Sequence, residues 1–317
     1  MMLSSWIKFC LAIVMVALLA LWGWRECATW QQRVIPRLSK VSFLPDTRTV
    51  RSRAMLERVN IHTPDFALLA RAISGNGAGT EHQGALKEGA QYYRYITELA
   101  PNRFDAYLVQ GACEYGLRNY PDAEQALKRA LYLSPNFFWT YYDLGMFYFN
   151  NGMYPVARGF LEGALARLGS YDDKALRGSK IFMDLLRSDE GMSLSQGMVK
   201  ASRDLQMASA VSCFILGDFA CVMKSSDAGR KSGGGAAFLT LSGAAAFQMK
   251  DDVRAAILLS GAIAEDPLSG AAHFFLALSL KRTGDEAGFE THYARAMELK
   301  FDPKEFLAGI KFPLRVY

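Results

Sequence analysis

Residues 104–137 (FDAYLVQGACEYGLRNYPDAEQALKRALYLSPNF) and 138–171 (FWTYYDLGMFYFNNGMYPVARGFLEGALARLGSY) are two consecutive blocks of 34 residues that share one pattern. The same internal offsets carry Tyr107, Gly111, Tyr120, Ala123 and Ala130 in the first block and Tyr141, Gly145, Tyr154, Ala157 and Ala164 in the second. A fixed period of this length predicts a stack of helical repeats. Such a unit cannot bury its apolar side alone, so its neighbours must cover it, and the stack presents an extended surface.

The two blocks resemble tetratricopeptide repeats (TPR), which pack two antiparallel helices into 34 residues. Small residues in that family stand where helices cross closely, a role that Gly111, Ala123 and Ala130 would take in this chain. A second, weaker pair of blocks spans 236–269 and 270–303, with Gly243, Ala255, Ala262 and Pro267 in register in the first and Leu276, Ala277, Leu280, Gly284 and Ala296 in the second. The resemblance implies an all-α, TPR-like superhelix.

The other segments are less regular. Residues 63–101 hold two apolar-periodic stretches around a polar loop, which predicts one repeat with an enlarged turn. Residues 172–235 predict a helix at KIFMDLLRS, a shortened helix pair over QMASAVSCFILGDFACVMKSS and a flexible break at SGGG. Residues 304–317 predict a short closing helix that ends at Pro313. We therefore expect five to six helix pairs, a kink or discontinuity in the middle and no strands.

An apolar segment lies near the N-terminus. Residues 9–24 (FCLAIVMVALLALWGW) carry no charge and lie between Lys8 and Arg25. As a helix they rise about 24 Å, less than the roughly 30 Å hydrocarbon core. Trp6, Trp22 and Trp24 would lie at the interfaces and the flanking cations can snorkel, so we expect a single-pass transmembrane anchor. A cleaved signal peptide is the alternative, although no A-x-A-like cleavage site follows the stretch.

Positive charge gathers just after this segment. The formal net charge is +5, and residues 31–60 hold seven Lys or Arg residues against two acidic ones. Because the excess adjoins the apolar segment and does not cover the repeats, it predicts contact with anionic lipid headgroups and argues against a nucleic-acid binder. By the positive-inside rule it favours the cytoplasmic side for the repeats, with the periplasmic or other extracytoplasmic side as the alternative.

The sequence thus predicts five parts. They are an anchor at 1–30, a basic juxtamembrane linker at 31–60, N-terminal repeats at 61–171, a degenerate helical linker or repeat at 172–235, and C-terminal repeats with the closing helix at 236–317.

No catalytic residue, metal site or cofactor is predicted. The GNGAG stretch at 75–79 follows no predicted strand and lacks the G-K-[ST] ending of a phosphate loop. The four histidines have no metal-ligand spacing, and we expect them in the core or on the surface. The five cysteines include no C-x-x-C pair, so neither a disulfide framework nor a zinc site is indicated. Cys113 is predicted to be a small core residue, and Cys213 and Cys221 could approach one another across a helical turn.

The resemblance implies that the first helix of each repeat lines the inner face. The candidate partner-binding residues there are Tyr115, Trp139, Tyr142, Met146, Phe149, Phe247 and Phe274. The stripe over 139–149, which ends beside Asn150, has the aromatic and methionine content of interface cores, although burial by neighbouring helices is the alternative explanation. Chaperone-binding members clamp a carboxylate at positions that are Leu108, Ala112, Tyr142 and Met146 in this chain. An apolar helix or extended segment is therefore the expected ligand.

These expectations describe a membrane-anchored, non-enzymatic scaffold or adaptor. It would bind protein partners through the inner face and the lipid bilayer through residues 9–24 and 31–60, with no nucleic acid and no small-molecule substrate. The alternative is a permanent structural subunit of a large membrane assembly, which should bury more than about 2,000 Å² with its partners.

Overall fold

The computed structural model describes residues 63–74, 79–188 and 194–315, which all belong to one compact unit, Ile61–Tyr317. The predicted anchor at 9–24 and the basic linker at 31–60 lie outside the described residues. Among the helices that the structure does describe, none has the length and apolarity needed to cross a bilayer.

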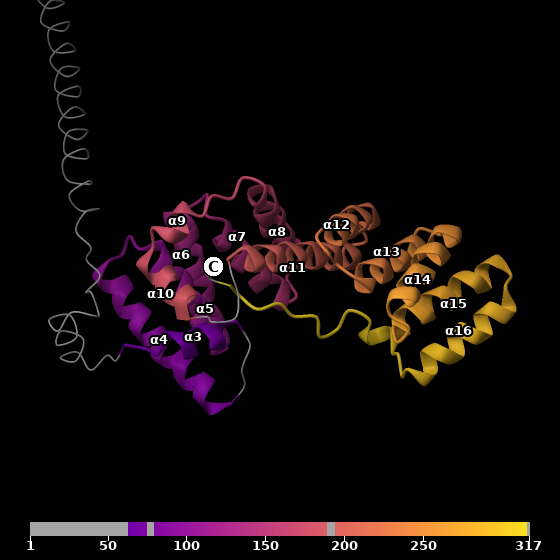
Figure 1. The fold of residues 1–317 in the computed structure, drawn as a ribbon, viewed down its shortest axis with the longest axis horizontal. Helices are drawn as coiled ribbons and strands as arrows, with labels where there is room; N and C mark the ends of the chain where they lie inside the picture. Colours follow the sequence, from indigo (N-terminus) through magenta and orange to yellow (C-terminus); the bar gives the residue numbers. More distant parts are fainter. Residues whose placement is uncertain (1–62, 75–78, 189–193, 316–317) are drawn as a thin grey trace, which may run out of the picture. The chain divides into compact units, whose positions relative to one another are not determined.

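Helices make up the described part of the chain, which contains no strand, as the sequence predicts (Figure 1). They are α3 (Phe66–Ile73), α4 (Thr80–Leu99), α5 (Phe104–Gly116), α6 (Tyr120–Leu133), α7 (Phe138–Asn150), α8 (Tyr154–Leu168), α9 (Lys174–Arg177), α10 (Lys180–Ser188), α11 (Leu194–Ile215), α12 (Phe219–Lys231), α13 (Ala236–Gln248), α14 (Asp252–Glu265), α15 (Gly270–Thr283) and α16 (Glu286–Glu298), followed by the 3-10 turn η1 (Pro303–Glu305).

Twelve of these helices form six pairs, the upper end of the predicted five to six. The first, or A, helices are α3, α5, α7, α11, α13 and α15, and the second, or B, helices are α4, α6, α8, α12, α14 and α16. Each A helix contacts the B helix of its own pair. Where another pair follows, both helices of a pair also contact the A helix of that next pair. The row is therefore unbroken from α3 to α15, and the expected discontinuity is absent from the packing of these described helices.

Most A helices are followed by a residue in the left-handed backbone conformation, and these residues recur with the period of the repeats. The positive-φ residues Arg118, Gly152, Gly217, Lys250 and Gly284 occupy this turn. In each case the next amide donates to the carbonyl five residues earlier, as Met153 does to Tyr148, which satisfies an end carbonyl of the helix. The residues at 118 and 152 are one 34-residue period apart, and so are those at 250 and 284.

Glycines let the paired helices approach closely, as the resemblance implies. A Cβ atom at Gly111 would lie 2.8 Å from Leu127 Cγ, and one at Gly243 would lie 2.4 Å from Leu259 Cγ. The alanines of the predicted register are fully buried on the facing helices: Ala123, Ala130, Ala157, Ala164, Ala255, Ala262 and Ala296. The period in the sequence is thus a period of helix–helix contacts.

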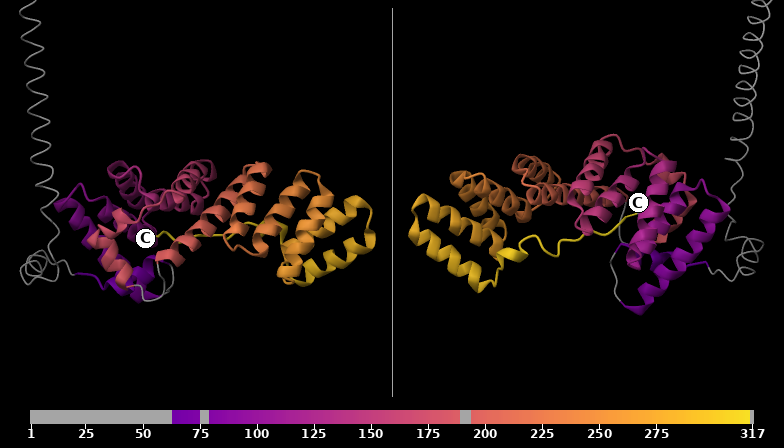
Figure 2. Two further views of the ribbon diagram at one scale, coloured as in Figure 1. Left: turned by 45° about the horizontal axis from the view of Figure 1, so that its top comes forward. Right: turned by 180° about the vertical axis from the view of Figure 1, so that it is seen from behind.

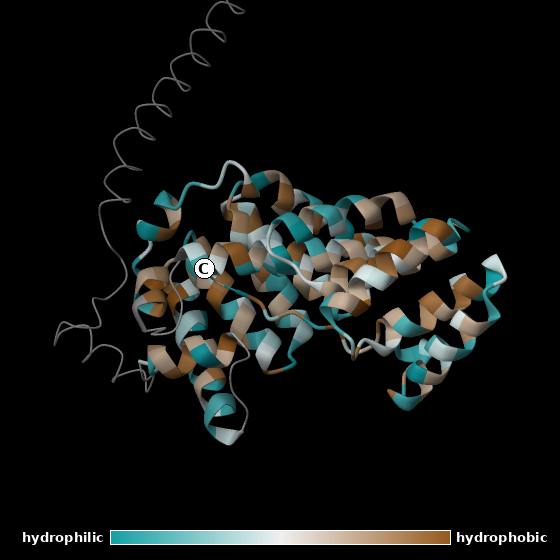
Figure 3. Cartoon of the chain, turned by 45° about the vertical axis from the view of Figure 1, so that its right-hand side comes forward, coloured by the Kyte–Doolittle hydropathy of each residue, from teal (hydrophilic) through white to brown (hydrophobic). Residues whose placement is uncertain are grey.

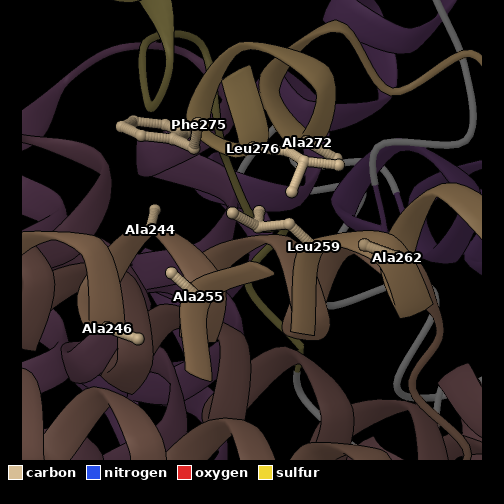
Figure 4. Close-up of a cluster of buried hydrophobic side chains, with 8 residues drawn as sticks. All are labelled: Ala244, Ala246, Ala255, Leu259, Ala262, Ala272, Phe275 and Leu276. Atoms are coloured by element: carbon tan, nitrogen blue, oxygen red, sulfur yellow. The ribbon is translucent and has the colours of Figure 1, made fainter. Parts of the chain in front are cut away.

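Most helices carry both apolar and polar residues around their circumference (Figure 3). In the C-terminal half, the buried cluster joins α13, α14 and α15, with Leu259 of α14 facing Ala272 and Leu276 of α15 (Figure 4). The predicted helix KIFMDLLRS is α10, and the predicted helix pair over 206–226 is α11 and α12, both of which are longer than expected.

The closing helix predicted at 304–317 is wrong. Only η1 forms there, and residues 310–315 run without helix back along the row to α7 (Figures 1 and 2). Pro313 and Gly309, whose φ is +76°, both disfavour a helix, and side chains on α7 supply hydrogen bonds for the backbone of this segment. The residues at 172–188 are likewise not a repeat, because α10 leaves the row and packs on α3 and α5.

Candidate functional site

Two segments of the chain lie on the A helices of the N-terminal half, where the sequence predicts partner binding. The first is α10, and Ser179, which directly precedes it, donates its hydroxyl to Asp105 at 2.6 Å. The Ser179 Oγ also accepts from the Phe182 amide at 3.2 Å and so caps α10. Asp105, in the first turn of α5, is consequently buried beneath α10.

Aromatic rings complete this contact. The ring of Phe182 stacks on Phe137 with centroids 5.5 Å apart and meets Phe104 edge-on at 6.0 Å. The α5 side chains Leu108 and Ala112, which line the predicted groove, are also buried. The inner side of the first two described repeats is therefore occupied by α10.

The second occupant is residues 310–315, which we call the docked segment. The Asn150 Nδ2 group donates to the Phe312 carbonyl at 2.6 Å, and the Phe312 amide donates back to Asn150 Oδ1 at 3.0 Å. The Lys311 ammonium group also donates to the Asn150 carbonyl. A side-chain amide that bonds both backbone groups of one residue recognises extended polypeptide independently of its side chain.

Apolar contacts flank this amide. The rings of Phe149 and Phe312 meet edge-on with centroids 5.3 Å apart, and Leu314 is fully buried. Phe149 is one of the predicted partner-binding residues, and in this conformation its neighbour is the docked segment.

An acidic pocket receives Arg315, which is only 7% exposed. Its amide donates to Asp143 Oδ1 at 2.6 Å, its Nε donates to the Tyr142 hydroxyl at 3.2 Å, and its guanidinium is 3.4 Å from Asp204 on α11. The Tyr142 hydroxyl in turn donates to Asp204 at 3.2 Å. A buried cation needs such partners because desolvation of an unpaired charge is costly.

The carboxyl of Asp143 is the most unusual group of this pocket. Burial raises its pKa well above the usual range, against the opposing effects of the Arg315 amide bond and charge. Its second oxygen, Oδ2, is buried and has no hydrogen-bond partner among the described residues. Burial likewise raises the pKa of Tyr142, and the Asp204 charge acts in the same direction.

The predicted site residues divide into two groups. Tyr142 and Phe149 contact the docked segment. The other five have these surroundings: Trp139 is fully buried and donates to the Tyr171 hydroxyl, Met146 is fully buried, Tyr115 contacts Phe147, Tyr120 and the Asn150 side chain, Phe247 lies beneath the Arg282 guanidinium, and Phe274 contacts Phe275, Tyr293 and Phe301. A partner role for these five residues stays a prediction.

Sequence reasoning missed Asp143 and Asp204. Asp143 is the one acidic residue in the otherwise uncharged stretch 138–150, and that isolation was an available signal. Asp204 carried no signal, because the sequence did not identify residues 194–205 as part of an A helix.

A hollow of about 740 Å³ lies against α4, α5 and α6. Arg94 on its wall is paired with Glu114 at 2.6 Å and with Asp122 at 3.2 Å, and Lys128 is paired with Glu124 at 2.6 Å. These two cations are already neutralised, and Arg129, also on the wall, lies over the Tyr132 ring. Within the residues that the structure describes, no group of three or more His, Cys, Asp or Glu side chains is placed to hold a metal ion.

Three cysteines lie in the described part of the chain. Cys113 is buried, as predicted, and burial raises the pKa of its thiol. Cys213 and Cys221, which were expected to be able to approach one another, form a disulfide that joins α11 to α12, although the sequence indicated no disulfide framework. The turn between the two helices brings residues eight apart in sequence within reach of one another.

Reduction of this disulfide should lower the free energy of unfolding by about 2–3 kcal/mol, because it frees the small loop between the two cysteines in the unfolded chain. Urea denaturation with and without dithiothreitol measures the difference. The Cys221→Ser variant is the control, since the reductant should leave its denaturation curve unchanged. Equal curves for the oxidised and reduced wild-type chain would contradict the expectation.

A histidine pair joins α15 to α16. The Nδ1 atoms of His273 and His292 are 2.9 Å apart, and His273 Nε2 lies 3.3 Å from the Pro267 carbonyl. Burial lowers the pKa of His292, the neighbouring His273 adds to this effect, and Asp285 opposes it. The folded state therefore favours the neutral His292 ring.

Stability of the last repeat should fall as the pH drops below the usual histidine pKa of about 6.5, because the unfolded chain then binds a proton that folded His292 resists. The loss should be complete once the pH is below the lowered pKa of the folded state. Thermal unfolding at about pH 7.5 and about pH 5 tests this. The His292→Gln variant should lose much of the pH dependence, and a wild-type melting temperature that is constant across this range would refute the assignment.

Comparisons with known proteins agree with this architecture. The family model for the tetratricopeptide repeat matches residues 126–158. None of the curated proteins compared with the chain matches it. Among solved structures, YrrB, described as a TPR protein with an unusual peptide-binding site, is 14% identical, with 69% of this chain and 97% of that chain covered and a TM-score of 0.49.

Two further structures are similar at the same level. MamA is 14% identical, with 71% of this chain and 98% of that chain covered and a TM-score of 0.47. BtubC (BKLC) from P. vanneervenii is 16% identical, with 74% and 94% covered and a TM-score of 0.45. The family-model match and the six stacked helix pairs together identify the described part of this chain as a TPR-like helical-repeat fold.

Proposed function

We propose that this chain is a non-enzymatic scaffold that binds an extended segment of a partner protein on α7 and α11. The observation that carries the proposal is the pair of hydrogen bonds between Asn150 and the backbone of Phe312. The same surface also offers a ring contact at Phe149 and an acidic pocket at Asp143 and Asp204. Backbone recognition with flanking side-chain pockets is a general way to hold an extended peptide.

Affinity purification of the full chain in mild detergent tests this function. The Asn150→Ala variant should recover at least about ten-fold less partner, because two backbone hydrogen bonds are lost. Asn151→Ala is the matched control, since Asn151 bonds only the Phe147 carbonyl of its own helix. Unchanged partners at unchanged yield from Asn150→Ala would refute the proposal.

We further propose that residues 9–24 anchor the scaffold in a membrane. The segment is uncharged and is followed by a basic stretch, and tethering would raise the effective concentration of the repeats near membrane partners. Carbonate extraction of membranes should leave the full chain in the pellet. The chain with both Val14→Arg and Leu18→Arg should instead appear in the supernatant. A wild-type chain that appears in the supernatant would refute the anchor.

We also propose which side of the membrane the repeats lie on, from the pairing of two cysteines. A disulfide between Cys213 and Cys221 is suited to an oxidising compartment, which supports the extracytoplasmic alternative over the cytoplasmic side favoured by the charge pattern. Alkylation of the denatured chain, taken directly from cells, distinguishes the two. Three of the five cysteines should react on the extracytoplasmic side, since two are joined, and all five on the cytoplasmic side.

A structural subunit is the second candidate, supported by exposed apolar residues on α14. Val253 and Ile257 are each 69% exposed and lie one helical turn apart. A permanent partner would cover them, so Val253→Asp with Ile257→Asp should then dissociate the complex. The scaffold function predicts that this pair of changes leaves the partners bound at Asn150 in place.

A further inference from the structure

We propose that the docked segment, residues 310–315, is an intramolecular stand-in for the partner. The partner would carry an extended stretch with an aromatic residue followed three positions later by arginine, as Phe312 is followed by Arg315. It would bind by displacing the docked segment. This inference rests on the proposed function and adds the chemistry of the ligand and the competition for its site.

The spacing between the two recognised side chains is fixed by the surface itself. Asn150 lies at the C-terminal end of α7 and holds the backbone of Phe312. Asp143 lies seven residues earlier on the same helix, two turns away, and accepts the amide of Arg315. Two turns of helix span about 11 Å, which matches three residues of extended chain at about 3.3 Å each. A ligand must therefore be extended between these two points.

The aromatic requirement comes from Phe149. Its ring faces Phe312 edge-on, with centroids 5.3 Å apart, and both rings flank the Asn150 amide. The intervening Leu314 is buried to 1% exposure, so the position before the arginine also needs an apolar side chain. An aromatic ring at the first position therefore has a defined contact, whereas a polar one would be desolvated without a partner.

The cation requirement comes from three groups on two A helices. The side chain of Arg315 reaches the Tyr142 hydroxyl and the Asp204 carboxylate, and its amide reaches Asp143. The Asp204 carboxylate and the Tyr142 hydroxyl contact the guanidinium, so an acidic residue at this position would meet the like charge of Asp204. The pocket thus selects a basic ligand, in contrast to the acidic tails that other members of the family bind.

The docked segment does not satisfy every polar atom of the pocket. Asp143 Oδ2 is fully buried without a hydrogen-bond partner among the described residues, and the guanidinium lies 3.4 Å from Asp204, near the limit of a hydrogen bond. A buried polar atom without a partner costs free energy. A ligand that also hydrogen-bonds Asp143 Oδ2 would bind this pocket better, which makes the docked segment displaceable.

Binding of a fluorescent peptide tests the competition directly. The probe is AGIKFPLRVY, the sequence of residues 308–317, and the protein is the full chain in detergent micelles. The covalently attached segment competes at an effective concentration on the order of millimolar, so wild-type protein should bind the probe weakly. The Arg315→Ala chain, whose own segment is weakened, should bind it with a Kd at least about ten-fold lower. Phe312→Ala in the chain should also lower the Kd of the probe. This second variant keeps the test possible if the Arg315→Ala chain does not fold.

Matched controls test which contacts hold the probe. Adding Asn150→Ala to the Arg315→Ala chain should abolish binding of the probe, whereas adding Asn151→Ala should not. A probe with glutamate in place of its arginine, or alanine in place of its phenylalanine, should bind at least about ten-fold more weakly. Equal Kd values for the wild-type and both opened chains, or for the arginine and glutamate probes, would overturn the inference.

Its failure is distinguishable from failure of the proposed function. Suppose that Asn150→Ala loses partners in the purification, but the probe binds the wild-type and opened chains with equal Kd values and the arginine and glutamate probes bind equally well. The scaffold function then stands, and the stand-in role of residues 310–315 is wrong. If the inference is right, Arg315→Ala should recover more partner than the wild-type chain and Asn150→Ala should recover less.

Discussion

Replacing Trp139 with alanine should lower the free energy of unfolding by about 3–5 kcal/mol. The indole is 0% exposed and has ring centroids 4.9 Å from Phe138 and 5.5 Å from Tyr142. Its loss would leave a cavity between α7 and its neighbours and would remove the hydrogen bond to the Tyr171 hydroxyl, which is 3.2 Å long. Urea denaturation of the full chain followed by circular dichroism measures the change.

Tyr132→Ala is the matched control, because that aromatic side chain is 75% exposed and its loss should change stability by no more than about 0.5 kcal/mol. The comparison also separates the two explanations of the aromatic stripe at 139–149. A Trp139→Ala chain that unfolds at the wild-type urea concentration but loses its partners would place Trp139 on the binding surface and not in the core.

Leu259→Ala should cost about 2–5 kcal/mol, because Leu259 is fully buried at the centre of the cluster that joins α13, α14 and α15 (Figure 4). Ile257→Ala, two residues away on α14, is the control. That side chain is 69% exposed, so its loss should be nearly neutral. The same denaturation measurement applies, and equal effects of the two changes would contradict the burial of Leu259.

Gly243 and Leu259 should be strongly coupled. A methyl group at Gly243 in the wild-type chain would meet Leu259 Cγ at 2.4 Å, so Gly243→Ala should destabilise despite the better helix propensity of alanine. In the Leu259→Ala background the same methyl group partly fills the cavity. The double-mutant cycle should give a coupling free energy of at least about 1 kcal/mol, and additive effects would show that the two positions do not touch.

The helical repeats could be predicted because their determinants are local and periodic. Gly111 and Ala123 pack within one helix pair, and the turn residue at Gly152 follows directly on its helix. Each repeat poses the same packing problem, so each repeat carries the same small residues. Even the weak C-terminal blocks kept this pattern, with Ala255 and Ala262 fully buried.

The packing of α10 and of the docked segment on the A helices could not be predicted, because these contacts are neither local nor periodic. The contact of Ser179 with Asp105 joins residues 74 positions apart, and that of Arg315 with Asp143 joins residues 172 apart. Neither belongs to a period, so no sequence pattern marks it. The resemblance to tetratricopeptide repeats identified Tyr142 and Phe149 as inner-face residues, but it could not tell that residues of the same chain lie against them.

Hydrogen–deuterium exchange at residues 310–315 tests the central claim, that this segment occupies the A-helix surface. The amides of Phe312 and Arg315 donate to Asn150 and Asp143, so they should exchange at least about ten-fold more slowly in the full chain than in the free peptide AGIKFPLRVY. Asn150→Ala should accelerate exchange at Phe312, and Asn151→Ala should not. Exchange in the wild-type chain at the rate of the free peptide would contradict the account.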